Sequence, residues 1–157
     1  MNIQITVAGQ EDLKKAFDNS PRLIAEELKG VIGRAAFTIE GKAKGYAPRK
    51  TGALASSIHT EGPNISGVEV SARVGTNLSY APYQEFGTGI YAGRGMITPK
   101  RAKVLAWKDG GRWVFARAVK GVPAKRYFQR AREETLPLLS GLLKGALGSI
   151  VVRLAKD

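Results

Sequence analysis

The sequence predicts an α+β fold in which a long N-terminal helix packs on a small antiparallel sheet, with a protruding loop and a C-terminal helix. Three observations support this expectation. Apolar residues recur every three to four positions after Pro21, which is typical of an amphipathic helix. Residues 68–74 alternate between apolar and polar, as in a strand with one buried face. A second helical periodicity follows Pro137.

The N-terminal part is predicted to hold three elements. Residues 3–7 alternate as in a short strand, and residues 11–19 can form a short helix. Ser20 and Pro21 have the form of an N-cap followed by proline at the first helical position. The long helix that follows, of about 25 residues, is expected to end before Pro48.

The next segment is predicted to hold a short helix and two strands. Thr51 can cap a helix over residues 52–58. Strands are expected near residues 58–61 and 68–75, because both are rich in strand-forming side chains. Residues 61–64, with the sequence EGPN, are interpreted as a turn.

Three aromatic residues, Tyr80, Tyr83 and Phe86, lie at helical spacing within residues 79–86. We interpret them as a stripe that faces the core of the domain. A platform on which a ligand stacks is the alternative interpretation.

Residues 88–103 are predicted to form an extended basic loop. The segment has three glycines, one proline, four basic residues and little periodicity. Loops of more than about 12–15 residues are uncommon in compact domains unless they are functional or disordered. We therefore expect this loop to be mobile in an isolated subunit.

A hairpin is predicted next, because strand formers at 104–107 and 113–115 flank Asp109-Gly110-Gly111. A further strand is expected over residues 116–120.

Helix formers return in the C-terminal part of the chain. Pro123 is expected to start a helix that runs to Glu134, and Pro137 is expected to kink or restart it. Residues 136–156 are then predicted to be a C-terminal helical arm. The whole chain, 1–157, is expected to be a single domain.

The charge is concentrated in one part of the chain. The net charge is +12, from 25 lysines and arginines and 13 acidic residues. Between Arg94 and Arg132 twelve basic residues accompany one acid, Asp109, which gives +11. A charge distribution of this kind attracts polyanions or an acidic protein surface.

The sequence offers little chemistry. There is no cysteine, and His59 is the only histidine, so cysteine-ligated and histidine-cluster metal sites are excluded. Nucleophile-elbow, phosphate-loop and dinucleotide-binding motifs are absent. We therefore expect no enzyme activity and no cofactor. A membrane span is also not expected, because Pro137, Lys144 and several glycines interrupt residues 136–154.

Three sequence blocks together resemble a known family. They are APRKTGALASSI at 47–58, VGTNLSYAPYQEFGT at 74–88 and VKGVPAKRYFQRA at 119–131. Their order and spacing resemble the phage tail-component family typified by gene product ten of HK-97-like siphophages. The resemblance covers roughly residues 20–131.

The resemblance implies a structural virion protein of the neck or tail-completion type, located in the tail or head–tail neck and in the host cytoplasm during assembly. It implies a homo-oligomeric ring around the DNA channel, six-fold or a multiple of six, that contacts other connector, portal-side or tail-tube proteins. A basic nucleic-acid-binding module is the alternative function. The residues expected to contact other subunits or partners are Tyr91, Arg94, Met96, Lys100, Arg101, Lys103, Leu143, Leu147 and Ile150, of which Arg94, Lys100 and Arg101 are candidates to face DNA.

Overall fold

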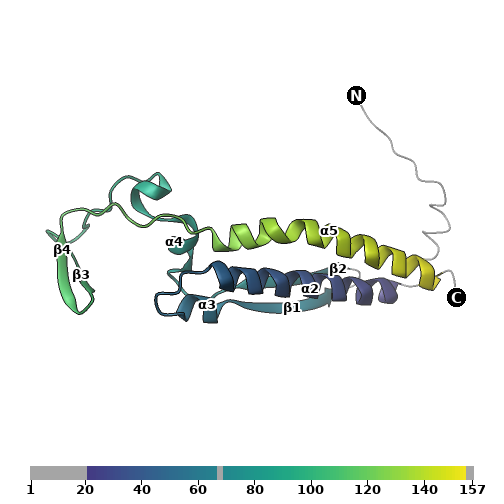
Figure 1. The fold of residues 1–157 in the computed structure, drawn as a ribbon. Coiled ribbons are helices and arrows are strands. Elements are labelled where there is room, and N and C mark those ends of the chain that lie inside the picture. Colours follow the sequence, from purple (N-terminus) through teal and green to yellow (C-terminus); the bar gives the residue numbers. More distant parts are fainter. Residues whose placement is uncertain (1–20, 67–68, 155–157) are drawn as a thin grey trace, which may run out of the picture. The chain divides into compact units, whose positions relative to one another are not determined.

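The computed structural model describes residues 21–66 and 69–154 and has the α+β composition that the sequence predicts (Figure 1). The strand and helix predicted within residues 3–19 lie outside the described residues. The chain divides into two compact units, each built from separated segments. Unit 1 comprises residues 1–38, 60–74 and 134–157, and unit 2 comprises residues 39–59 and 75–133.

Unit 1 is built on parts of two long helices and one small sheet. The helix α2, Pro21–Tyr46, contributes its first part, and α5, Tyr127–Leu154, contributes its last part. These parts lie side by side (Figure 1), and Arg153 donates a 2.6 Å hydrogen bond to Glu27. The buried residues include Ala25, Val31, Ala35 and Ala36 of α2 and Thr135, Ala146 and Ile150 of α5. Small side chains on α2 allow this close packing.

The sheet of unit 1 pairs strand β1, His59–Ser66, with strand β2, Glu69–Gly75. Val70 and its alternate neighbours in β2 are half-buried, which confirms the predicted alternation. The prediction of a turn at 61–64 is wrong, because Gly62 and Pro63 lie inside β1. Gly62 has a positive φ of 91°. Pro63 packs against Gly33 of α2, where a Cβ added to the glycine would lie 3.4 Å from the Pro63 Cγ. The turn-forming residues therefore shape the strand where it meets α2.

Unit 2 is assembled around the end of α2 and the start of α5. Its other helices are α3, Ala53–Ser57, α4, Ala81–Phe86, and a short 3-10 helix η1, Gly89–Ala92. The helix α2 ends at Tyr46, just before Pro48, as predicted. The N-cap of α3 is Gly52, not Thr51, since Gly52 adopts a left-handed conformation with φ 75°. The buried apolar residues of unit 2 are Ala43, Ala47, Leu54, Ile58, Ala81, Tyr127 and Ala131.

A buried carboxylate fixes where α5 begins. Glu85 of α4 is 6% exposed, and its two carboxylate oxygens accept hydrogen bonds from the backbone amides of Phe128 and Gln129, both at 2.9 Å. These amides belong to the first turn of α5 and have no acceptor within the helix. The predicted start at Pro123 is therefore wrong: the helix begins at Tyr127, where this carboxylate satisfies its free amides and meets its positive end.

The aromatic residues of α4 do not face the core. Ala81 and Glu85, four residues apart, form the buried face of this helix. Tyr83 and Phe86 are 58% and 69% exposed, and Tyr80 is also exposed. The prediction of a core-facing stripe is therefore wrong, because the buried face is selected by the contact of Glu85 with α5.

Residues 88–103 contain a 3-10 helix and backbone hydrogen bonds that the sequence did not predict. The backbone of Thr88 and Ile90 donates to the carbonyls of Val122 and Lys120, and Ile97 pairs with Val119 in both directions. Gly89 makes this contact possible, because a Cβ there would lie 2.2 Å from the Lys120 carbonyl oxygen. The segment is thus tied along residues 119–122, which form one bridge in place of the strand predicted at 116–120.

The predicted hairpin is confirmed. Strand β3, Leu105–Asp109, pairs antiparallel with β4, Arg112–Ala116. Gly110 and Gly111 both have positive φ, 55° and 85°, as a two-residue hairpin turn of this hand requires.

Helix α5 runs through Pro137 as one element, so the prediction of a restart is wrong. Proline removes one backbone donor, and the turns on either side continue the helix. Among the described helices, α5 alone is long and apolar enough to cross a membrane by length and composition. The sequence did not predict this, because Pro137, Lys144 and several glycines interrupt the apolar run of this helix. Helices that pack inside soluble proteins meet the same criterion. Only 17% of its most apolar window is buried in this structure. The predicted arm is described as far as Leu154.

We predict that Glu85→Gln lowers the free energy of unfolding by about 1–3 kcal/mol, because one buried amide loses its acceptor and the charge at the helix end is removed. Urea unfolding followed by circular dichroism measures this. Glu133→Gln is the matched control, because Glu133 is exposed on α5, the helix that Glu85 caps, and bonds only the Gln129 side chain among the described contacts. Equal unfolding midpoints for the two variants would contradict the capping role.

A second prediction concerns Gly89. Gly89→Ala and Gly93→Ala both place a side chain at positive φ, 59° and 69°, but only Gly89 lacks space for it. We expect Gly89→Ala to lower the thermal midpoint clearly more than Gly93→Ala, with an additional loss of about 1–3 kcal/mol from overpacking. Calorimetry of the two variants checks this, and equal midpoints would show that residues 88–90 are not held against residues 119–122.

Candidate functional site

The positive charge of the chain belongs to unit 2. This unit holds sixteen lysines and arginines and four acidic residues, whereas unit 1 holds nine of each. The formal charges are therefore +12 and zero. The charge is not confined to the segment that the sequence pointed to, because Lys42, Lys44, Arg49 and Lys50 also belong to unit 2.

The four acids of unit 2 are already engaged in internal contacts. Glu85 caps α5, and Glu133 accepts a hydrogen bond from Gln129. Glu40 pairs with Lys44 at 2.6 Å, and Asp109 lies 3.6 Å from Lys50. Sixteen cations cannot be neutralised by four acids, so the surface of unit 2 carries a strong positive field.

The predicted contact residues of the 88–103 segment lie on the surface of unit 2. Tyr91, on η1, and Met96 are about half exposed, and the four basic residues are also exposed: Arg94, Lys100, Arg101 and Lys103. The structure therefore brings these six residues into one surface segment. Their contacts with other molecules remain predictions.

The predicted contact residues of α5 belong to unit 1 and divide into two groups. Leu147 is exposed and Leu143 is half-buried. Ile150 is 0% exposed, so this residue belongs to the core of unit 1 and not to its surface. The helical periodicity predicted that the three residues share one face of the helix. Their exposure differs because this face is only partly buried.

The hairpin presents aromatic residues on both of its faces. Trp113 and Phe115 lie on one face with ring centroids 6.3 Å apart, and the Lys108 ammonium is 5.4 Å from the Trp113 ring. Trp107, paired with Val114, lies on the other face. All three aromatic side chains are exposed. The aromatic residues alternate with other residues along the two strands. This alternation did not show that both faces of the hairpin are exposed to solvent.

Together with α4, the hairpin makes unit 2 rich in exposed aromatic side chains. The exposed aromatics of this unit are Tyr80, Tyr83, Phe86, Tyr91, Trp107, Trp113 and Phe115. Aromatic residues, Met and Arg are enriched in protein interfaces.

Tyr127 lies beneath α4 and is part of the core. Its hydroxyl donates to the Ala81 carbonyl oxygen at 3.3 Å. Burial raises the pKa of Tyr127 to about 12, with smaller contributions from Glu85 and Tyr80. The raised pKa follows from the burial of a phenol that packs in the core and is held by this hydrogen bond.

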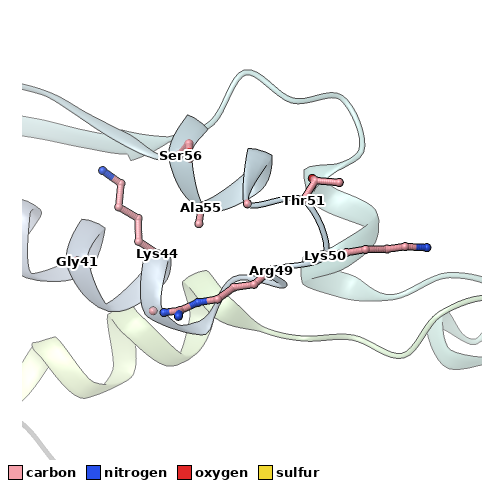
Figure 2. A pocket seen from close by; sticks show the side chains of 9 residues that line it. Gly41, Lys44, Arg49, Lys50, Thr51, Ala55 and Ser56 are labelled. Atoms are coloured by element: carbon pink, nitrogen blue, oxygen red, sulfur yellow. The ribbon is translucent and has the colours of Figure 1, made fainter.

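A second basic feature lies where α2 meets α3. An open depression with a volume of about 870 Å³ is lined by side chains of both helices and of the segment between them (Figure 2). Its lining includes Lys44, Arg49, Lys50, Thr51 and Ser56, and it contains no acid. The sequence pattern of residues 47–58 predicted a helix cap and carried a family resemblance, but it gave no sign of this depression.

The described residues offer no cluster of metal ligands. No group of three histidine, cysteine or carboxylate side chains lies close enough among them to hold a metal ion. His59 is exposed and contacts the Ser57 carbonyl oxygen at 3.0 Å. The features of the site are therefore charge and exposed aromatic area, which serve binding.

Comparison with known proteins gives a match to a family model. Residues 11–87 match the family model described as "Bacteriophage HK97-gp10, putative tail-component". No curated protein and no solved structure matches the chain. The match includes the block at 47–58 and the block at 74–88 up to Gly87, whereas the block at 119–131 lies outside it. Over residues 11–87, just under half of its length, this chain is therefore similar to the HK97-gp10-like family, which is described as a putative bacteriophage tail component.

Proposed function

We propose that this chain is a neck or tail-completion subunit that assembles with copies of itself into a ring, which joins head and tail around the DNA channel. The proposal places the protein in the virion and in the host cytoplasm before assembly. It assigns the protein a structural role without catalysis.

The observation that carries the proposal is the exposure of Tyr83 and Phe86. Both lie in the sequence block that carries the family resemblance, and both are inside the family match. In the isolated chain they are 58% and 69% exposed. Large aromatic side chains outside the core have a clear physical use at an interface, where their burial contributes most of the binding energy.

Two further features support assembly with other proteins. The hairpin is a two-stranded element with aromatics on both faces, and such hairpins are only marginally stable unless something packs on them. Most of the apolar window of α5 is uncovered, including Leu147. Repeated head-to-tail contacts between identical chains close into a ring when the rotation between them permits it. Six-fold symmetry, or a multiple of it, is part of the proposal.

A basic nucleic-acid-binding module is the second candidate, favoured by the +12 charge of unit 2. The two functions are compatible if the basic residues Arg94, Lys100 and Arg101 face the DNA inside the ring. A free nucleic-acid binder would bind as a single chain with steep salt dependence, whereas a ring subunit depends on protein contacts that salt weakens less.

We predict that Tyr83→Ser combined with Phe86→Ser prevents assembly. Both side chains are exposed, so the folded chain should keep its unfolding midpoint while losing apolar contact area. The measurements are the mass of the purified protein by light scattering and its incorporation into phage particles when the variant replaces the natural gene.

Phe37→Ser is the control, because Phe37 is 61% exposed on the part of α2 that belongs to unit 1. We expect the control to assemble like the unchanged protein. If the double variant forms oligomers and enters particles as well as the control does, the aromatic residues of α4 are not an assembly contact and the proposal fails.

A further inference from the structure

The depression between α2 and α3 has the chemical character of an anion site. Lys44 and Arg49 flank it from two different elements, and Lys50 extends away from them (Figure 2). Lys44 is partly compensated by Glu40. Arg49 has no hydrogen-bond or ion-pair partner within residues 21–66 and 69–154, and its guanidinium carries five donors.

The rest of the lining adds hydroxyl groups and open backbone. Thr51 and Ser56 are exposed hydroxyl residues at the rim. Gly41, Gly45 and Gly52 also line the depression, and a Cβ at any of them would meet nothing within 4 Å. A ligand chain can therefore approach the backbone closely at these positions.

The shape and composition indicate which anion fits. Sites for small molecules are mostly enclosed and apolar, whereas this depression is open and its lining includes two lysines, one arginine and two hydroxyl residues. Lysine, arginine, serine and threonine side chains are the groups that contact phosphates of the DNA backbone. Single-stranded nucleic acid is held by aromatic side chains on which the bases stack, and the lining has none. The phosphates of a duplex, whose bases are turned inward, fit this lining better.

We infer that the depression lined by Lys44, Arg49, Thr51 and Ser56 binds the phosphate backbone of duplex DNA, independently of sequence. The site is separate from the basic residues of the 88–103 segment. It belongs to a single chain, since all its residues lie in unit 2, and it does not depend on ring formation.

The test compares two variants of the full chain that lose the same charge. Lys44→Gln combined with Arg49→Gln removes the cations of the depression. Arg117→Gln combined with Lys120→Gln removes two exposed cations of unit 2 that do not line it. Binding to a labelled duplex of random sequence is followed by fluorescence anisotropy at several salt concentrations, and circular dichroism confirms that both variants are folded.

We expect the first variant to bind about tenfold more weakly and to reduce the slope of log affinity against log salt by about one to two, as the loss of one or two phosphate contacts requires. The control variant should change affinity by about twofold, through the general field alone. Equal losses in both variants, or no binding by the unchanged chain at low salt, would overturn the inference.

Polyglutamate of matched charge and inorganic phosphate are added as competitors. The inference expects the duplex to resist both at equal charge concentration. If polyglutamate displaces the duplex as well as unlabelled duplex does, the depression recognises acidic protein and the inference fails. Light scattering of the same samples reports ring formation separately, so failure of the site and failure of assembly give different results.

Discussion

The unequal distribution of charge is the constraint on which the rest of this structure depends. Unit 2 must remain folded with sixteen cations and four acids, and each of those acids has an internal contact. Repulsion among like charges opposes the compact state, so local interactions that do not involve charge pairs hold the unit together. The close approach of Gly89 to the Lys120 carbonyl and the small buried core around Tyr127 are two of them. Most of the remaining cations of unit 2 are exposed, so they are available to an acidic partner.

Glu85 links this constraint to the fold. It is the one acid of unit 2 that is buried, and its contact is with the backbone amides of α5 and not with a cation. By joining α4 to the first turn of α5, it determines which face of α4 is covered. Tyr83 and Phe86 are exposed as a consequence, so the same interaction that positions α5 also leaves these two aromatic side chains on the surface.

The sequence predicted the elements whose signals are local. The long helix ending before Pro48, the alternating strand at 69–75 and the glycine turn of the hairpin are all specified by neighbouring residues. The sequence did not predict the features that depend on contacts between residues distant along the chain. The cap of α5 joins residues 43 and 44 positions apart, and the spacing of Tyr80, Tyr83 and Phe86 showed a shared helix without showing which face is covered. The depression at Lys44 and Arg49 was missed for a different reason: its lining lies within residues 41–56, but the depression depends on the angle at which α2 and α3 meet, which no local sequence signal gives.

Under the proposed function, the exposed aromatic side chains and the excess cations of unit 2 would be covered and compensated by neighbouring subunits. The most direct measurement is hydroxyl-radical footprinting of the free chain and of the same chain in phage particles, read out by mass spectrometry. The account predicts that Tyr83, Phe86, Trp113 and Phe115 are oxidised several-fold more slowly in the particle, while Phe37 is oxidised equally in both. Equal oxidation of all five residues in the two states would show that unit 2 is not covered on assembly and would contradict the account.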